Sequence, residues 1–241
     1  MQCRPLVPLI ALVLSWLVIG GQAAAGPWPR AVGEVFLSTS FGSEEARGRR
    51  TAFAEIYAEA GWRAGLVPAA RLRLDSPLGQ EGRGDGAADL RLRWHPGGNG
   101  GLPWGLALGL EGGVLIDSGA RRGIGVAETA GFALAAVHLG RGMATPHGDG
   151  WLRLTLSTEE PLSDKGAARR EIFGQVGVRS EGGWIGLVSL SVFREADETT
   201  VKLRPGLGRS LGADRDILLE AVVERGGART RGLSLSFWQT F

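Results

Sequence analysis

Apolar and polar residues alternate with a period of two in short segments along most of this chain. The C-terminal segment Thr230–Phe241 shows the pattern clearly, because Ser234 and Ser236 share one parity. Its apolar residues share the other parity, and they are Leu233, Leu235, Phe237 and Phe241. Successive side chains of a strand point to opposite faces. The alternation therefore predicts a strand with one apolar and one polar face.

Eleven further segments follow the same rule and are separated by turn residues. Ala127–Leu139 has the composition of a helix as much as of a strand, and the surrounding pattern favours a strand. Gly42–Arg49 and Glu160–Arg169 are predicted as loops. The twelve predicted strands are Glu34–Phe41, Thr51–Trp62, Leu66–Asp75, Ala88–Trp94, Trp104–Asp117, Ala127–Leu139, Trp151–Glu159, Glu171–Ser180, Trp184–Arg194, Thr200–Leu207, Asp216–Arg225 and Thr230–Phe241.

Strands of about ten residues are long enough to cross a bilayer when they are tilted. An even antiparallel set can close on itself and leave no edge, as a hydrocarbon environment requires. The 40 glycines follow no collagen period and suit turns and curved strands. The sequence therefore predicts an all-β fold: a closed, antiparallel, transmembrane up-and-down β-barrel of about twelve strands with periplasmic N- and C-termini.

Residues 1–25 have the pattern of a secretory signal peptide. Arg4 provides the positive start, Leu6 to Ile19 is apolar, and Ala23 and Ala25 are small residues suited to cleavage before Gly26. The apolar run is shorter than the roughly twenty residues of a membrane-spanning helix. We therefore expect a cleaved leader followed by one barrel domain, residues 26–241.

Alternation alone does not distinguish a membrane barrel from a soluble β-sandwich, but the positions of tryptophan do. If odd-numbered strands run away from the termini, all the tryptophans after the leader lie at the end that holds the termini. Aromatic girdles of this kind form at membrane interfaces. Trp151 and Trp238 fall on the polar parity of their strands. The predicted girdle consists of Trp62, Trp94, Trp104, Trp151, Trp184 and Trp238.

The polar parity of the strands carries many charged residues. A charged side chain facing lipid at the bilayer midplane costs about 2–4 kcal/mol, so these residues are expected to face the lumen. Arginines 71, 73, 91 and 93 lie on neighbouring strands and predict a positive cluster beside Asp75 and Asp89. The predicted lumen-lining residues are Glu55, Glu59, Arg71, Arg73, Asp89, Arg91, Arg93, Glu111, Arg153, Glu171, Arg179, Lys202, Arg204, Glu220 and Glu224.

Two interpretations of this interior remain open. Arginine–carboxylate pairs can fill it and block conduction, or it can hold a water-filled passage whose arginines favour anionic solutes. A third interpretation is a lipid-modifying enzyme that uses His138, although the sequence spacing of His95, His138 and His147 indicates no Ser–His–acid set. The expected function is a passive channel for small solutes, with a plugged structural or surface-interaction barrel as the alternative and no enzymatic activity.

Several classes of partner are excluded by composition. The formal charge is only +2 and no basic block exists, so nucleic acid is not an expected partner. The lone cysteine, Cys3, lies in the leader, which excludes disulfides and cysteine–zinc sites in the mature chain. No metal or cofactor motif is present; the loop carboxylates of Glu195, Asp197 and Glu198 are expected to be solvated.

The C-terminal strand resembles the closing strand of Gram-negative outer-membrane barrels, which the barrel-assembly machinery reads as a signal. The signal residues here are Leu233, Leu235, Phe237 and Phe241, whereas Gln239 stands where those proteins usually carry an aromatic residue. Gly26–Arg30, Gly33–Ser38 and Gly61–Leu66 resemble segments of uncharacterised outer-membrane barrels common in alphaproteobacteria, which are similar in layout to channels proposed for uptake of hydrophobic compounds. The resemblance implies a monomer in the bacterial outer membrane, in contact with its lipid, and delivered by periplasmic chaperones.

Overall fold

The computed structural model describes residues 28–46, 48–78, 84–98, 102, 106–118, 130–164, 166–212, 214–226 and 229–241. The predicted leader, Trp104 and the first three residues of the predicted strand Ala127–Leu139 lie outside these ranges. Within them the chain forms one 3-10 turn, η2 (Arg63–Gly65), and twelve strands: β1 (Val35–Ala46), β2 (Arg49–Ala60), β3 (Leu66–Pro77), β4 (Asp85–Trp94), β5 (Leu106–Asp117), β6 (Ala130–Thr145), β7 (Gly148–Pro161), β8 (Arg169–Arg179), β9 (Trp184–Glu195), β10 (Glu198–Gly212), β11 (Arg215–Arg225) and β12 (Thr230–Thr240).

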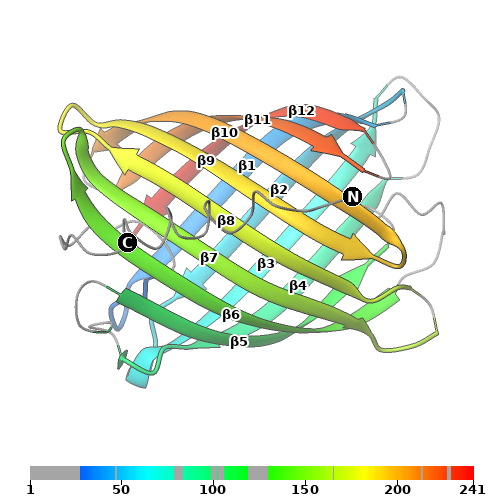
Figure 1. Ribbon diagram of the computed structural model, residues 1–241, viewed down its shortest axis with the longest axis horizontal. Helices are drawn as coiled ribbons and strands as arrows, with labels where there is room; N and C mark the ends of the chain where they lie inside the picture. The colour runs from blue at the N-terminus through cyan, green and yellow to red at the C-terminus, as the bar shows by residue number, and fades with distance from the viewer. Residues whose placement is uncertain are drawn as a thin grey trace, which may run out of the picture.

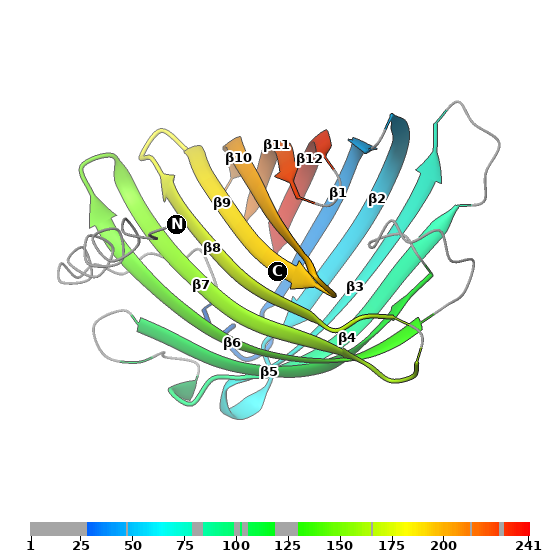
Figure 2. The ribbon, with the colours of Figure 1, turned by 45° about the vertical axis from the view of Figure 1, so that its right-hand side comes forward.

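The strands form a closed antiparallel barrel in which each strand pairs with its neighbours in sequence. Strands β1 and β12 close the barrel, with pairs that run from Phe36↔Thr240 to Ala46↔Thr230. All strands are inclined to the long axis of the barrel (Figures 1 and 2). The predicted all-β, closed twelve-stranded barrel is confirmed. No helix in the described part of the chain has the length and apolar character needed to span a bilayer.

The first hairpin is longer than the sequence analysis predicts. Gly42–Arg49 is not a loop, because β1 continues to Ala46 and β2 begins at Arg49, with Ala46 opposite Arg49 in the register. Glu44 faces the interior and contacts Arg73 at 3.2 Å, whereas Glu45 faces outward and contacts Arg231 at 3.0 Å. Glu44 and Glu45 thus each have a partner on their own face. These partners allow the strands to extend through a charged stretch.

Strand β6 settles the ambiguous alanine-rich segment. Residues 130–145 are extended and pair with β5 and β7 along their length, so the prediction of a strand is confirmed over its described part. Phe132 and Leu134 point inward and are buried, whereas the alternate residues between them face outward. Pairing on both sides decides the conformation here, because local propensity is weak compared with the tertiary context.

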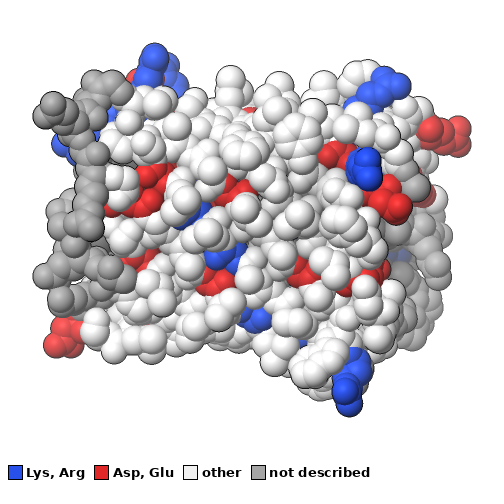
Figure 3. Space-filling model, turned by 180° about the vertical axis from the view of Figure 1, so that it is seen from behind, with Lys and Arg blue, Asp and Glu red and all other residues white. Residues whose placement is uncertain are grey.

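Aliphatic side chains cover the outside of the barrel. Leu72, Leu90, Leu154 and Leu219 are examples of the many large apolar residues that are exposed there. The opposite parity is buried and largely polar or charged, as at Asp89 and Ser236. In Figure 3, uncharged atoms cover most of the outer face, and the charged groups that project from it lie at the two ends. A protein with this inside-out pattern is suited to a hydrocarbon solvent.

The two ends of the barrel are distinguished by the chain termini. We call the end that holds residue 241 and the start of β1 the terminal rim, and the opposite end the distal rim. At the terminal rim, Val35 and Phe241 exchange backbone hydrogen bonds of 3.2 and 2.8 Å. The β6–β7 turn there needs glycine at position 148, where φ is +123° and a Cβ would lie 2.2 Å from the Arg179 carbonyl oxygen.

Tryptophans lie near the terminal rim on both faces of the wall. Trp62, Trp94 and Trp184 project outward and are 51, 46 and 51% exposed. Trp151 and Trp238 point inward, so the prediction that they belong to an outer girdle is wrong. Their parity places them inside, where Trp151 packs over Gly177 at a position in which a Cβ would lie 2.1 Å from its ring.

Candidate functional site: the charged interior

The fifteen charged residues predicted to line the lumen all lie on the inward parity of their strands. Each of them is buried or half-buried. They come from eight of the twelve strands. Strands β1, β6, β9 and β12 contribute none of them, and β5 and β7 contribute one each. The parity of the strands, which alternates strictly over these segments, places every one of them on the same side of the wall.

Arginines and carboxylates form a continuous network over β3, β4 and β5. Asp89 accepts hydrogen bonds from Arg71 and Arg91, the latter at 2.7 Å. Glu111 contacts Arg91 at 3.2 Å and Arg93 at 2.9 Å. The arginines predicted to cluster beside Asp75 and Asp89 are thus paired with carboxylates, to which the register adds Glu111.

The network continues to β2 and to the segment before β1. Arg93 contacts Glu59 at 3.3 Å, and Glu59 also accepts hydrogen bonds from Arg30 at 2.8 and 3.0 Å and from the Tyr57 hydroxyl at 3.0 Å. The Arg30 guanidinium lies 4.6 Å from the ring centre of Phe36. The segment that precedes β1 is thus held against the interior wall near the terminal rim. The role of Arg30 was missed because it lies outside every predicted strand.

Toward the distal rim a second network links strands that are not neighbours. Glu44 of β1 contacts Arg73 of β3 at 3.2 Å and Lys202 of β10 at 4.0 Å. Lys202 also contacts Glu224 at 3.5 Å, and Arg73 contacts Asp75 at 2.8 Å. The contacts of Glu44 reach over the strands that lie between β1 and β3 and between β1 and β10. Glu44 was missed because the predicted loop began two residues before it, although its strand parity would have indicated an inward position.

A third set of contacts fills the interior beside β7, β9, β11 and β12. Trp151, Ile185, Leu187 and Leu218 form a buried apolar cluster against which Trp238 packs. Arg179 of β8 contacts Asp216 of β11 at 2.5 Å, again across strands that do not adjoin. The Trp151 indole donates a hydrogen bond of 3.3 Å to Gln175. The alternation of the strands predicts polar residues inside the barrel, so it does not predict this apolar cluster.

His138 lies in the interior beside Glu111 and Thr155. Its Nδ1 is 2.9 Å from the Thr155 hydroxyl, and its Nε2 is 3.5 Å from a Glu111 carboxylate oxygen. The sequence analysis expected His138 near the end of a strand, whereas it lies within β6. His95 follows β4, and its Nδ1 donates a hydrogen bond of 2.9 Å to the Leu108 carbonyl oxygen. Burial and the positive charge of Arg93 lower the pKa of His95 to about 4.

Arg153, like Arg204, differs from the paired arginines of β3 and β4. Among the described residues, no carboxylate lies within ion-pair distance of it. Its Nε donates a hydrogen bond of 3.2 Å to Thr155, and its guanidinium lies 5.3 Å from the ring centre of Phe173. Its charge interacts through space with Tyr57 and Glu59 of β2, so side chains from opposite parts of the wall converge at this level. A cation without a local counterion in a narrow interior attracts anions.

The described part of the interior carries charged groups that can recognise a charged solute. No group of three or more His, Cys, Asp or Glu side chains within those residues is arranged to hold a metal ion. Arg204, Glu55 and Glu220 also face inward without an ion pair among the described residues. They add both signs of charge to the surface that a solute would meet.

Two solved structures share this architecture. The chain aligns with a structure described as "KdgM porin" with a TM-score of 0.53, 6% identity and coverage of 83% of this chain and 98% of that one. It aligns with the "COG4313 outer membrane channel from Pseudomonas putida F1" with a TM-score of 0.54, 11% identity and coverage of 91 and 100%. Neither a protein-family model nor a curated protein matches the sequence. At these identities the likeness concerns the fold alone: the chain has the closed β-barrel fold found in outer-membrane porins and channels.

Proposed function

We propose that the protein is a monomeric barrel of the bacterial outer membrane that acts as a passive channel for small solutes. In this arrangement both termini are periplasmic, the outer face contacts lipid, and periplasmic chaperones and the barrel-assembly machinery deliver the chain through its C-terminal strand. The observation that carries the proposal is the division of the wall into an aliphatic outside and a charged inside. Such a wall is stable only between hydrocarbon and a polar lumen.

We place the selective point of the proposed passage at Arg153, whose charge acts through space on Tyr57 and Glu59. The arginines of β3 and β4 are compensated by carboxylates. These two strands therefore do not give the lumen a positive potential that would favour anions. Arg153 supports it locally, because it is the arginine at this level whose charge has no carboxylate within ion-pair distance. We propose that small anions pass this point more readily than cations of the same size.

Conductance in planar bilayers tests this function. Refolded protein should give steps of current, and Arg153→Gln should lower the ratio of anion to cation permeability by about twofold or more. Arg209→Gln is the matched control, since Arg209 lies on the outer face over Trp184, with 5.1 Å between its guanidinium and the ring centre. Absence of current from correctly folded protein would refute the channel. An unchanged permeability ratio would refute the role of Arg153.

The second candidate is a barrel whose lumen is closed. It is favoured by the contacts that cross the interior, Glu44 with Lys202 and Arg179 with Asp216, and by the apolar cluster around Trp151. The same recordings decide between the two candidates. A closed barrel gives no current in the wild-type form, whereas removal of a cross-lumen group such as Trp151 would create a path for ions.

A lipid-modifying activity receives less support from the geometry. His138 and Thr155 lie on the inward parity with Glu111, whereas acyl chains would lie against the outer face. A lipid substrate would therefore have to enter the charged interior to reach them.

A further inference from the structure

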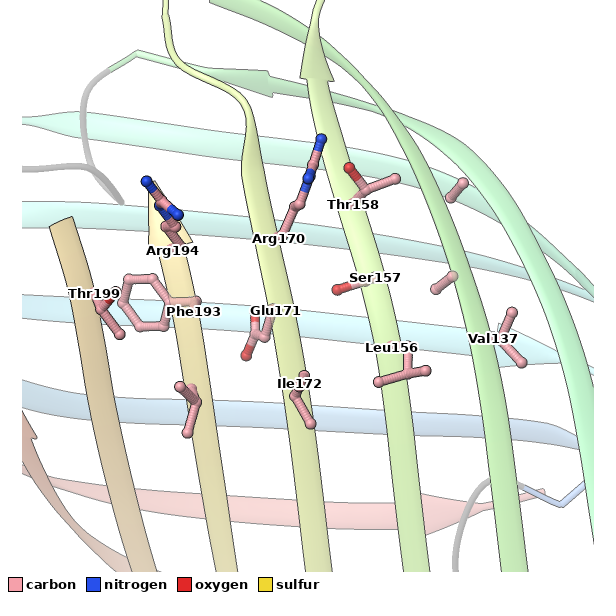
Figure 4. A pocket seen from close by; sticks show the side chains of 13 residues that line it. Val137, Leu156, Ser157, Thr158, Arg170, Glu171, Ile172, Phe193, Arg194 and Thr199 are labelled. Atoms are coloured by element: carbon pink, nitrogen blue, oxygen red, sulfur yellow. The ribbon is translucent and has the colours of Figure 1, made fainter. Parts of the chain in front are cut away.

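A hollow of about 580 Å³ lies in the wall near the distal rim, over β6 to β10. Most of the residues that line it point to the outside of the barrel, which the proposed function places in contact with lipid. In Figure 4, Arg170 and Arg194 lie at the upper ends of neighbouring strands, and Ile172 and Leu156 lie below them. A hollow that is basic at one end and apolar at the other has the chemical layout of an amphiphile.

The strand register organises this hollow into two outward-facing rows. The row nearer the distal rim is polar over most of its length: Ala135 pairs with Thr158, Thr158 with Arg170, Arg170 with Arg194, and Arg194 with Thr199. The next outward row is apolar throughout, and its successive partners are Val137, Leu156, Ile172, Val192 and Val201. The boundary between the rows coincides with the place where a headgroup would meet its acyl chains.

The polar row contains an unfavourable pair of like charges. Arg170 and Arg194 stand directly opposite each other on the same face, where side chains of antiparallel strands are about 4.5–5.5 Å apart at Cβ, and like charges in this position are destabilising. Among the described residues, Arg170 has no ion pair. Arg194 makes only exposed contacts, at 3.4 Å with Asp197 and at 3.3 Å with the Ala196 carbonyl oxygen. The outward carboxylate of Glu160 is hydrogen-bonded to Thr158 at 3.0 Å.

We propose that this hollow binds an anionic lipid with a terminal phosphate group, with its phosphate between Arg170 and Arg194 and an acyl chain over Leu156, Ile172 and Val192. A phosphate oxyanion accepts paired hydrogen bonds from a guanidinium and removes the repulsion between two of them. The phosphate matches the polar row of the hollow, and the acyl chain matches the apolar row. The inference rests on the outer face being in lipid, but it does not require that the lumen conducts.

Native mass spectrometry of the full barrel in nonionic detergent tests the inference. The probes are phosphatidic acid and a phosphatidylcholine with the same acyl chains. Wild-type protein should retain phosphatidic acid at least about tenfold more tightly, and Arg170→Gln/Arg194→Gln should abolish this preference, since each lost charge-assisted hydrogen bond weakens binding by about tenfold or more. Inorganic phosphate should compete poorly because it lacks the acyl chains.

Arg50→Gln/Arg231→Gln is the matched control. These arginines also face outward at the distal rim, but both contact Glu45, at 3.4 and 3.0 Å, so they already share a carboxylate. The control should keep the preference for phosphatidic acid. Loss of preference in both double variants would overturn the site in favour of general surface charge. Equal competition by inorganic phosphate would overturn the lipid as ligand.

Stability in detergent without added lipid provides a second readout. Arg170→Gln should raise the unfolding midpoint because it removes a like-charge pair, whereas Arg50→Gln should leave it unchanged or lower it. A lower midpoint for Arg170→Gln would show that Arg170 already has a stabilising partner, which would contradict the proposal. Absence of current in the bilayer recordings would refute the channel but would not change the lipid preference or the unfolding midpoints. The two proposals can therefore be refuted independently.

Discussion

The change in the free energy of unfolding on replacement of Arg93 by methionine indicates whether water reaches the charged network of the interior. Arg93 is 4% exposed and contacts Glu59 at 3.3 Å and Glu111 at 2.9 Å. Breaking a buried ion pair by removing one partner costs about 3–5 kcal/mol, whereas an exposed pair contributes about 0–1 kcal/mol. Glu59 keeps Arg30, and Glu111 keeps Arg91. We therefore expect Arg93→Met to lower the free energy of unfolding by about 3 kcal/mol, the low end of the buried range.

Equilibrium unfolding in urea, followed by tryptophan fluorescence of the barrel in lipid vesicles, provides the measurement. Arg50→Gln is the control, because it breaks an exposed pair with Glu45 and should cost less than about 1 kcal/mol. Adding Glu111→Gln to Arg93→Met should recover part of the loss, since it removes a buried carboxylate that has lost one of its two arginine partners. A cost below about 1 kcal/mol for Arg93→Met would refute the reasoning and show that water reaches this network.

Two further predictions concern packing and pH. Gly177→Ala should destabilise the barrel by about 1–3 kcal/mol, because its Cβ would lie 2.1 Å from the Trp151 ring. Gly174→Ala on the same strand meets open space and should be nearly neutral. Equal effects of the two substitutions in urea unfolding would contradict this. The free energy of unfolding should fall as the pH drops from about 6.5 to about 4. The pKa of His95 is about 4 in the folded protein and near 6.5 in the unfolded chain. The contribution of His95 to stability is therefore complete above this pH range and is lost within it. His95→Gln should remove this part of the pH dependence, and an unchanged slope would show that other groups cause it.

The sequence predicts the barrel well because its signal repeats in every strand. A period of two places Leu72 and Leu90 outside and Asp89 inside without any knowledge of neighbouring strands. The fold was therefore accessible from local pattern. Strand ends were less accessible, as at Glu44 and Glu45, because their pairing with Arg73 and Arg231 depends on residues far along the chain.

The interior was only partly predictable, for a related reason. Parity indicates that Arg71 and Arg91 point inward, but only the register shows that both share Asp89. Trp151 was assigned to the outer girdle from its place near a strand end, although its parity indicated the inside. The space that receives it exists because Gly177 on β8 lacks a side chain, a complementarity that a single strand cannot reveal.

The charge network over β2 to β5 has a consequence for how the barrel is built. Arg71, Arg91 and Arg93 find their partners on the same or a nearby hairpin, at sequence separations of 2 to 34 residues. A growing sheet that adds hairpins in order would neutralise these groups before its edges meet. By contrast, in the middle of the seam between β1 and β12 the Ser40–Ser236 contact joins two uncharged hydroxyls at 2.8 Å, and the ion pair between Glu45 and Arg231 lies at its distal end. The middle of the seam can therefore remain open to the bilayer until the last step without leaving an ion stranded there.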